Sequence, residues 1–244
     1  MSDDMTENTA PVVRRVMGIF AHPDDPEFFA GGTLARFAAE GAELTLVLIT
    51  SGDKGSDDPA MTPEMLVSIR EAEERAAGAV LGAREVIFLR VPDGGVFHTM
   101  ELRRELARLI RLKKPDTVIT CDPTAYWYGE GYINHPDHRA VGDVTMAAVF
   151  PTARDRLNFI ELERDEGLDT HKVKHLYLAG PSEATHFVDI TDYVETKIRA
   201  LREHKSQIKD MDAMADNIRQ RTLDTRSPVD MPRYIEAFRL FTLR

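Results

Sequence analysis

Short apolar runs of strand length alternate with segments of helical periodicity through the first half of this chain. The runs lie at residues 16–20, 44–50, 85–89 and 117–121, and the helical patterns between them lie at residues 33–40, 63–81 and 100–113. Parallel strands can be joined only by crossover connections of this kind, so the alternation is typical of a protein built on a parallel sheet. We therefore expect a Rossmann-like α/β fold, in which helices flank an open, mostly parallel sheet.

The second half of the chain is less regular. A long loop is expected at residues 122–134, and a helix that ends near residue 150 follows it. Two further strands are predicted at residues 173–179 and 186–190, then a charged helix at 192–209 and a polar helical tail with a last apolar patch at 234–243. Because no linker separates these segments, we expect the 244 residues to form a single domain, with residues 1–12 flexible.

Charge and cysteine content exclude several classes of partner and site. The chain has 31 basic and 41 acidic residues, a formal net charge of −10, which repels phosphate, so we expect neither nucleic acid nor a membrane as a partner. The first ten residues lack the features of a signal peptide, and we expect a cytoplasmic protein. The one cysteine, Cys121, excludes an intrachain disulfide and a thiolate-rich zinc site.

Two clusters of histidine and aspartate follow predicted strands. The first, AHPDDPE at residues 21–27, follows the first strand, and the second, HPDH at residues 135–138, opens a helix after the fourth strand and its long loop. Open α/β sheets bind ligands at this carboxyl edge of their strands. Carboxylates brought together there repel one another unless a cation offsets their charge, and imidazole and carboxylate both bind divalent metals. The sequence therefore predicts a metal site.

The adjacent residues Asp24 and Asp25 can take different roles at such a site. Neighbouring side chains tend to diverge, so one carboxylate can bind the metal while the other acts as a general base toward water. The residues alone leave open which carboxylate takes which role.

The two motifs together resemble those of the LmbE/PIG-L family of zinc-dependent N-deacetylases, which have an AHPDDxE and an HxDH motif. Three shorter segments are similar to the same family: TSGDKG at residues 50–55, the R-x-x-E helix at residues 70–82, and HKSQ at residues 204–207. The two metal motifs are specific in combination, whereas each short segment is weak alone. The resemblance covers most of the chain and implies hydrolysis of an acetamide to acetate and an amine.

The resemblance implies that His22, Asp25 and His138 are the zinc ligands and that Asp24 is the general base. Three protein ligands leave a coordination position for water, as a catalytic zinc site requires. Zinc is the implied cofactor, while another divalent metal such as Fe²⁺ stays open.

His135 and Asp137 complete the implied catalytic group. His135 would stabilise the oxyanion or protonate the leaving amine, and Asp137 would hydrogen-bond His135, fix its tautomer and keep it charged. Arg70 and Asp93 are implied to bind sugar hydroxyls, for which a guanidinium and a carboxylate are suitable partners. The implied substrate is a small-molecule amino sugar of the N-acetylglucosamine type. The sequence leaves its aglycone open, and also whether the chain forms a homo-oligomer.

The sequence allows two interpretations both of an aromatic run in the long loop and of His204. The aromatic run Tyr126-Trp127-Tyr128 in the long loop is compatible with stacking on an aglycone and with simple packing. His204 belongs to the HKSQ segment, which suggests a place near the site, but a solvated position on a charged helix is the default expectation.

Four other functions are compatible with parts of this pattern. A conjugate amidase that cuts a larger acyl group from a glucosaminyl thiol conjugate is the nearest alternative. A 2-His-1-carboxylate non-haem iron oxygenase has a similar ligand set, but it needs no adjacent base such as Asp24 and is usually built on a β-barrel. A dinucleotide-binding module would need GxGxxG, which is absent, and a metal-binding protein without turnover would not need every motif element. We therefore expect a metal-dependent N-deacetylase.

Overall fold

The computed structural model describes residues 14–244. Its strands are β1 (Arg15–Phe20), β2 (Glu43–Thr50), β3 (Ala83–Val91), β4 (Thr117–Cys121), β5 (Trp127–Tyr128), β6 (Tyr132–Ile133), β7 (His175–Ala179), β8 (His186–Asp189) and β9 (Ile235–Thr242). Its helices are α1 (Asp25–Ala39), α2 (Pro63–Leu81), α3 (Met100–Lys113), α4 (Pro136–Ala147), the π-helical turn η1 (Ala148–Thr152), α5 (Glu161–Arg164), α6 (Val194–Leu201) and α7 (Met211–Thr222). The flexibility expected for residues 1–12 concerns residues outside the described part of the chain.

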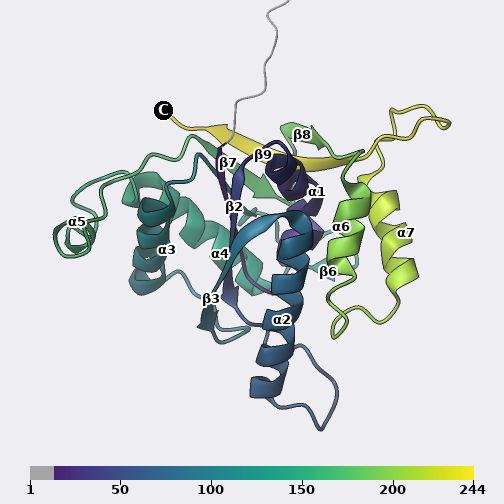
Figure 1. Ribbon diagram of the computed structural model, residues 1–244, viewed down its shortest axis with the longest axis horizontal. Coiled ribbons are helices and arrows are strands. Elements are labelled where there is room, and N and C mark those ends of the chain that lie inside the picture. Colours follow the sequence, from purple (N-terminus) through teal and green to yellow (C-terminus); the bar gives the residue numbers. More distant parts are fainter. Residues whose placement is uncertain (1–13) are drawn as a thin grey trace, which may run out of the picture.

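Seven strands form one sheet in the order β3-β2-β1-β4-β7-β9-β8, and β5 and β6 form a separate two-stranded ribbon. The five strands from β3 to β7 in this order are parallel, and β9 runs antiparallel to both of its neighbours. Figure 1 shows the sheet between two groups of helices, with α3, α4 and α5 on one side and α1, α2, α6 and α7 on the other. The expected Rossmann-like α/β fold is thus confirmed.

Strand β1 illustrates why the sheet needs helices on both faces. Val16 and Phe20 lie in the apolar layer formed with α1, α2 and α6, whereas Met17 and Ile19 lie in the layer formed with α3 and α4. All of these side chains are at most 1% exposed. Because successive side chains of a strand point to opposite faces, an uninterrupted apolar strand is buried only between two helical layers.

Helices α2 and α3 begin and end where the sequence predicts. Thr62 caps α2 by accepting a hydrogen bond from the N–H of Met65 at 3.3 Å, and Thr99 caps α3 in the same way. Gly82 ends α2 with a φ of 86°, in the left-handed region that glycine adopts readily. None of the helices formed by the described residues has both the length and the apolar character needed to cross a bilayer.

Several segments differ from the sequence expectation. Helix α1 begins at Asp25 rather than at residue 33, because the acidic motif with Pro26 in the first turn itself starts the helix. The charged helix predicted at residues 192–209 is the shorter α6, and the long loop contains the β5–β6 ribbon. The last apolar patch, expected at the end of a helical tail, is strand β9, which pairs with β7 and β8.

The connections of β1 and β4 place both metal motifs at one point of the sheet. These strands are neighbours, but β1 continues through α1 to β2 on one side while β4 continues through α4 toward β7 on the other. Loops beyond the carboxyl ends of such a pair diverge and leave room for a ligand. The first motif follows β1 and the second opens α4, so the topology brings them together.

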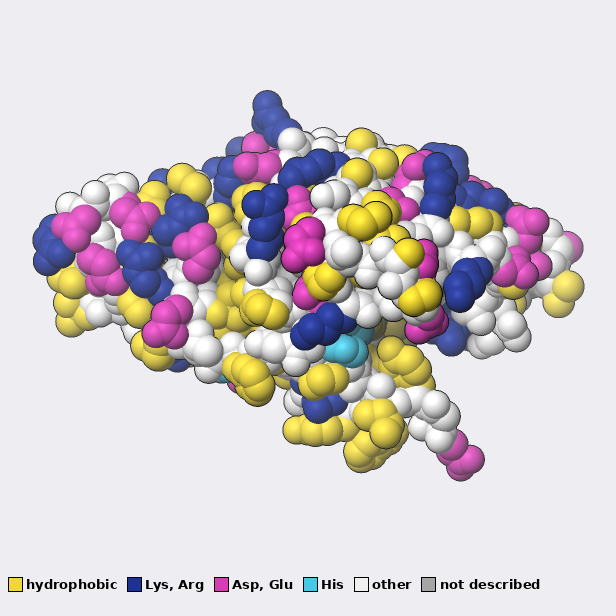
Figure 2. Space-filling model, turned by 90° about the horizontal axis from the view of Figure 1, so that it is seen from below, with side chains coloured by type: hydrophobic (Ala, Val, Ile, Leu, Met, Phe, Trp, Pro, Cys, Tyr) yellow, Lys and Arg dark blue, Asp and Glu magenta, His cyan; other side chains and the backbone are white. Residues whose placement is uncertain are grey.

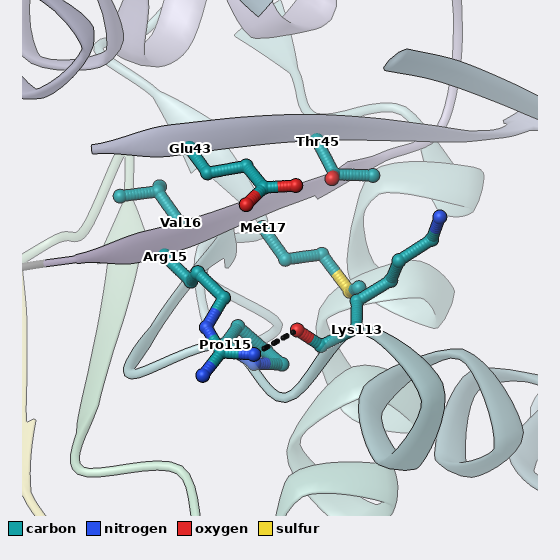
Figure 3. A pocket seen from close by; sticks show the side chains of 7 residues that line it. All are labelled: Arg15, Val16, Met17, Glu43, Thr45, Lys113 and Pro115. Atoms are coloured by element: carbon teal, nitrogen blue, oxygen red, sulfur yellow. Dashed lines mark hydrogen bonds between the residues drawn. The ribbon is translucent and has the colours of Figure 1, made fainter. Parts of the chain in front are cut away.

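A small cavity lies at the opposite, amino edge of β1 and β2. Its volume is about 10 Å³, roughly the space of one water molecule. Arg15 donates a hydrogen bond to the carbonyl of Lys113 there, at 3.3 Å (Figure 3). The lining residues are Arg15, Val16, Met17, Glu43, Thr45, Lys113 and Pro115. This cavity is too small for a substrate.

Gly142 of α4 lies against the end of β4, where a side chain does not fit. A Cβ on Gly142 would overlap the carbonyl oxygen of Cys121 and lie 3.0 Å from the ring of Pro123. We predict that Gly142→Ala lowers the free energy of unfolding by about 1–3 kcal/mol, because overpacking against the backbone outweighs the higher helix propensity of alanine. Thermal unfolding measures the change. Gly131→Ala is the control, since a Cβ there meets nothing within 4 Å, and equal effects of both substitutions would contradict the interpretation.

Candidate metal centre and active site

The loop from β1 into α1 holds His22, Asp24 and Asp25. The main-chain N–H of His22 donates to Oδ2 of Asp25 at 2.8 Å, which fixes this buried carboxylate above the end of β1. Asp24 is the N-cap residue of α1 and has a φ of 100°, a conformation that costs a non-glycine residue about 1–3 kcal/mol. The loop therefore holds a strained Asp24 between His22 and Asp25.

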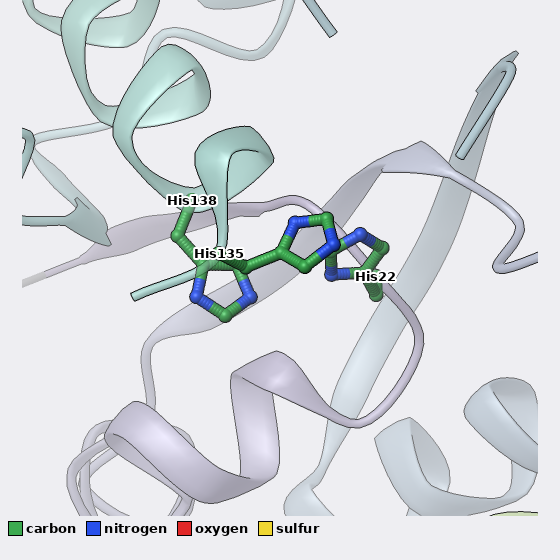
Figure 4. Close-up of side chains that lie close together, drawn as sticks. All are labelled: His22, His135 and His138. Atoms are coloured by element: carbon green, nitrogen blue, oxygen red, sulfur yellow. The ribbon is translucent and has the colours of Figure 1, made fainter. Parts of the chain in front are cut away.

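The carboxylate of Asp25 lies between two imidazoles. Its Oδ2 is 3.3 Å from Nδ1 of His22, and its Oδ1 is 3.1 Å from Nε2 of His138 in the first turn of α4. The ring centroids of His22 and His138 are 5.2 Å apart, and the ring of His135 lies 4.7 Å from that of His22. Figure 4 shows the three rings converging from the β1 loop and the start of α4. The structure thus brings together the three residues predicted as metal ligands.

Each of these imidazoles has its second nitrogen beside another side chain. Nε2 of His22 lies 3.1 Å from Oδ1 of Asp93 and 3.4 Å from Oδ2 of Asp137. Nδ1 of His138 lies 2.9 Å from Oδ1 of Asn134. Metal-binding histidines are commonly held in this way, with one nitrogen toward the metal and the other on an acceptor oxygen. The remaining nitrogens, Nδ1 of His22 and Nε2 of His138, both face Asp25.

The charges of the centre favour a bound cation. Burial lowers the pKa of His22, but the carboxylates of Asp137, Asp25 and Asp93 outweigh burial and raise it to about 12. Burial raises the pKa of Asp25, yet His138 and His22 outweigh it and hold this pKa well below its usual range. The three carboxylates around one imidazole leave excess negative charge. One donor atom from each of His22, His135 and His138 lies within 4.8 Å of the others, and the same holds for His22, Asp93 and Asp137, while Asp25 contacts His22 and His138. This donor set fits a divalent metal.

His135 is half-buried at the N-cap of α4. Its Nδ1 accepts a hydrogen bond from the main-chain N–H of Asp137 at 3.2 Å. Burial and the nearby charge of His22 lower the pKa of His135. A neutral imidazole whose Nδ1 accepts a hydrogen bond has its proton on Nε2. The contact between His135 and Asp137 is thus made to the main-chain N–H of Asp137, whereas the sequence predicted a contact with its carboxylate.

The carboxylate of Asp137 binds other partners than expected. It accepts hydrogen bonds from the N–H of Gly94 at 2.7 Å and the N–H of Val96 at 3.3 Å, and its other neighbour is Nε2 of His22. The side chain thus joins the turn after β3 to α4 and supports His22. The sequence gives no sign of this contact, because the turn and α4 are far apart along the chain.

Arg70 of α2 lies beneath the loop after β1 and is 4% exposed. Its Nη2 donates to the carbonyl of Pro23 at 2.6 Å and to the carboxylate of Asp24 at 3.2 Å, and its Nη1 donates to the carbonyl of Gly52 at 3.2 Å. Burial raises the pKa of Asp24 to about 6, although Arg70 acts to lower it. Arg70 therefore ties the loops after β1 and β2 together and holds the Asp24 carboxylate.

Asp93 reaches the centre from the turn after β3. Its N–H donates to Oδ1 of Asp53 at 2.8 Å, and its carbonyl accepts a hydrogen bond from Lys54, so the TSGDKG segment positions this residue. An open hollow of about 330 Å³ lies beside this turn, at the ends of β2 and β3. The residues that line the hollow are Ser51, Asp53, Pro63, Glu64, Val67, Arg90, Val91 and Pro92.

The sequence analysis did not identify Asn134. Of the two interpretations given for His204, the solvated position on a helix is the wrong one. Besides contacting His138, Asn134 donates from Nδ2 to the carbonyl of Ala125 at 2.7 Å and from its N–H to the carbonyl of Tyr126 at 2.9 Å. Its position directly before HPDH was the only signal in the sequence. His204 is fully buried beside Glu27 instead of lying on a solvated helix.

The aromatic run of the long loop lies on the β5–β6 ribbon. Tyr126 and Trp127 are 55% and 69% exposed, whereas the hydroxyl of Tyr128 donates to the carbonyl of Gly180 at 3.0 Å. Figure 2 views the molecule from the carboxyl edge of the sheet and shows a histidine in a hollow, with hydrophobic side chains beside it. Tyr128 thus anchors the ribbon. The guanidinium of Arg139 lies over the ring of Tyr126 at 4.5 Å, and the more exposed Trp127 is the aromatic side chain best placed for contact with a ligand.

Comparison with known proteins matches this geometry to one family. The model of the family described as PIG-L: GlcNAc-PI de-N-acetylase matches residues 17–149, which include both motifs. The diacetylchitobiose deacetylase of Thermococcus kodakarensis is 32% identical over 195 residues, which are 80% of this chain and 70% of that protein. The 1D-myo-inositol 2-acetamido-2-deoxy-alpha-D-glucopyranoside deacetylase of Actinosynnema mirum is 32% identical over 240 residues and covers 82% of each chain.

A solved structure agrees with the sequence matches. The N,N'-diacetylchitobiose deacetylase from Pyrococcus horikoshii, in complex with its inhibitor, superposes with a TM-score of 0.82 at 28% identity. The superposition covers 94% of this chain and 84% of that one. The resemblance inferred from the two motifs is therefore confirmed, and the chain belongs to the LmbE/PIG-L family of de-N-acetylases.

Proposed function

We propose that this chain is a metal-dependent hydrolase that removes the acetyl group from an N-acetylglucosamine-type substrate. The main observation is the Asp25 carboxylate between Nδ1 of His22 and Nε2 of His138, with Asp24 next to it along the chain. The relatives support the same reaction, since their names describe deacetylases of diacetylchitobiose and of an acetamido-deoxy-glucopyranoside.

We assign metal binding to His22, Asp25 and His138, and we infer zinc as the metal. Imidazole nitrogen and carboxylate oxygen suit zinc, and Fe²⁺ is the second candidate. A divalent ion held by these residues would supply a Lewis acid that polarises an amide carbonyl and makes water more acidic.

Residues beside the metal ligands carry out the proton transfer and bind the oxyanion. Asp24 accepts a proton from the attacking water, and Arg70, 3.2 Å from its carboxylate, holds this base in position. His135 donates its Nε2–H to the oxyanion that forms on the amide carbonyl, which favours the first of its two expected roles. The proton held by Asp24 is then transferred to the leaving nitrogen, the C–N bond breaks, and acetate and a free amine result.

Sugar binding by Arg70 and Asp93 stays a prediction. The geometry favours Asp93 for direct contact with a hydroxyl, because its carboxylate belongs to the centre and it lies beside the 330 Å³ hollow. Both Nη atoms of Arg70 already donate to protein acceptors, so we infer that this residue acts through Asp24.

The conjugate amidase remains the second candidate within hydrolases, because it would use the same metal ligands and the same base. The matched relatives are named deacetylases, which favours the smaller acetyl group. An iron oxygenase is not favoured, because the described residues form an α/β fold rather than a β-barrel and place Asp24 beside the proposed metal ligands. A cytoplasmic location stays a prediction.

The proposed reaction predicts acetate release that depends on metal. We expect the purified protein, loaded with zinc, to release acetate from at least one N-acetylglucosaminide in a screen of varied aglycones. A chelator should abolish release and added zinc should restore it. Release of a longer acid from N-acyl analogues, with none of acetate, would point instead to the amidase.

Asp24→Asn separates catalysis from metal binding. We predict that turnover falls by roughly 10² to 10⁴, because the amide cannot accept the proton, while bound zinc stays at the wild-type level. His138→Ala serves as the matched comparison and should leave less than stoichiometric zinc. Metal analysis alongside kinetics makes the distinction. Zinc lost from the Asp24→Asn variant would reverse the roles of Asp24 and Asp25, and stoichiometric zinc in the His138→Ala variant would contradict the role of His138 as a ligand.

Asn134 provides a test of how the ligand His138 is oriented. Its Oδ1 lies 2.9 Å from Nδ1 of His138 and so favours the tautomer whose Nε2 is free for metal. We predict that Asn134→Ala weakens zinc affinity by about 10- to 100-fold, whereas Asn134→Asp, which keeps the acceptor oxygen, weakens it less. Competition with a chromogenic chelator measures both affinities. Wild-type affinity in the alanine variant would exclude this role.

A further inference from the structure

Three fully buried ionisable residues lie behind the loop of the proposed base and take no part in the mechanism above. Glu27 belongs to α1, Glu74 to α2 and His204 to the turn after α6, and each is 0% exposed. Nε2 of His204 is 3.3 Å from a carboxylate oxygen of Glu27 and 3.8 Å from Oε2 of Glu74. One oxygen of each glutamate has no hydrogen-bond partner. Burying charged groups is costly, so their presence at this position needs an explanation.

Glu74 contacts the main chain of Asp24. The N–H of Asp24 donates to Oε2 of Glu74 at 3.1 Å. Asp24 has a φ of 100°, in the left-handed region that an aspartate adopts only when its surroundings hold it there. Arg70, one helical turn before Glu74, binds the Asp24 carboxylate at 3.2 Å. One face of α2 therefore holds Asp24 by both its main chain and its side chain.

The turn after α6 is bound to the same helix. The N–H and the hydroxyl of Ser206 donate to the two carboxylate oxygens of Glu73 at 2.8 and 2.7 Å. This pair of hydrogen bonds fixes the HKSQ turn against α2 and places His204 between Glu27 and Glu74. Nε2 of His204 is within hydrogen-bond distance of Glu27 and within ion-pair distance of Oε2 of Glu74, so the imidazole borders the space in which the Glu74 carboxylate lies.

We propose that Glu74, oriented by His204, positions Asp24 as the general base. The hydrogen bond from the Asp24 N–H keeps the loop in the conformation in which Asp24 meets Arg70 while Asp25 meets the two histidines. Glu74 and His204 are positioning residues, since neither touches the reacting atoms. This inference rests on the proposed function, in which Asp24 accepts the proton.

Glu74→Leu removes the acceptor while keeping a side chain of similar size. In the zinc-loaded protein we expect kcat to fall about 10- to 100-fold, the scale on which a misplaced catalytic group costs activity, with KM and zinc content unchanged. Glu74→Gln keeps an acceptor oxygen and should retain kcat within about threefold. Glu74→Asp shortens the side chain by one methylene, which moves the acceptor oxygen away from the Asp24 N–H, and we expect the same loss of kcat. This variant tests the proposal if the leucine variant does not fold.

A double-mutant cycle separates positioning from a general loss of structure. In the Asp24→Asn background, Glu74→Leu should change the residual kcat by less than about twofold, because the base it positions is already absent. Glu71→Leu is the matched control on the same helix, since Glu71 is buried and binds Ser51 and Arg90, away from Asp24. It should lower Tm while keeping kcat within about threefold. An equal loss of kcat in the presence and absence of the Asp24 carboxylate would overturn the proposal.

Two measurements do not depend on activity. Amide hydrogen exchange at Asp24 should be slow in the wild type and in Glu74→Gln, and faster in Glu74→Leu. Unchanged exchange in the leucine variant would refute the positioning contact even if the deacetylase assay failed. Glu27, Glu74 and His204 also offer donor atoms within 4.8 Å of one another. If the wild type binds a second equivalent of zinc and Glu74→Leu does not, these three residues form a metal site and the positioning role is refuted.

Discussion

Repulsion among carboxylates at the carboxyl edge of the sheet is the constraint on which the arrangement of this site depends. Asp25, Asp93 and Asp137 all lie against His22, and Asp24 is the next residue along the chain from Asp25. In water such carboxylates would move apart, so here each has a specific partner. The main-chain N–H groups of Gly94 and His22 bind Asp137 and Asp25, the guanidinium of Arg70 binds Asp24, and the Asp93 carboxylate lies against His22. A divalent ion held by His22, Asp25 and His138 would add the positive charge that these partners do not supply.

The topology explains why the sequence was sufficient to predict much of this arrangement. Strands β1 and β4 are buried on both faces, so their apolar runs are recognisable, and the motif after β1 and the motif that opens α4 must meet at one switch point. Caps such as Thr62 and Gly82 depend only on local chemistry, and the ends of α2 followed from them. Motif order and sheet topology were enough to predict that the two motifs meet, whereas the choice of Asp25 over Asp24 as the ligand came from the family resemblance.

The features that were missed depend on contacts between distant segments. Strand β9 has no local signal, because its pairing with β7 and β8 comes from residues far away along the chain. The carboxylate of Asp137 was expected on its neighbour His135, but the turn at Gly94 offers two N–H groups that bind it better. His204 is buried by contacts of the same kind, because Ser206 binds Glu73 of α2. Only the HKSQ resemblance pointed to this position, since the charge pattern of residues 192–209 is typical of a solvated helix.

The two motifs are supported by different parts of the fold, and this difference accounts for the remaining family-like segments. Helix α2 holds the Asp24 loop through Arg70 and Glu74, and the HKSQ turn is bound to the same helix through Glu73, so these two segments support the residue that we propose as the base. The ribbon between β4 and α4 serves the ligand His138 through Asn134, whose other hydrogen bonds close the base of that ribbon. Because the base and the ligand rest on separate supports, the exposed tip of the ribbon can change its aromatic residues without moving Asp24. Under the proposed function, a change in the exposed ribbon on the α4 side would alter contacts with the group attached to the sugar and leave the Asp24 loop on the α2 side in place.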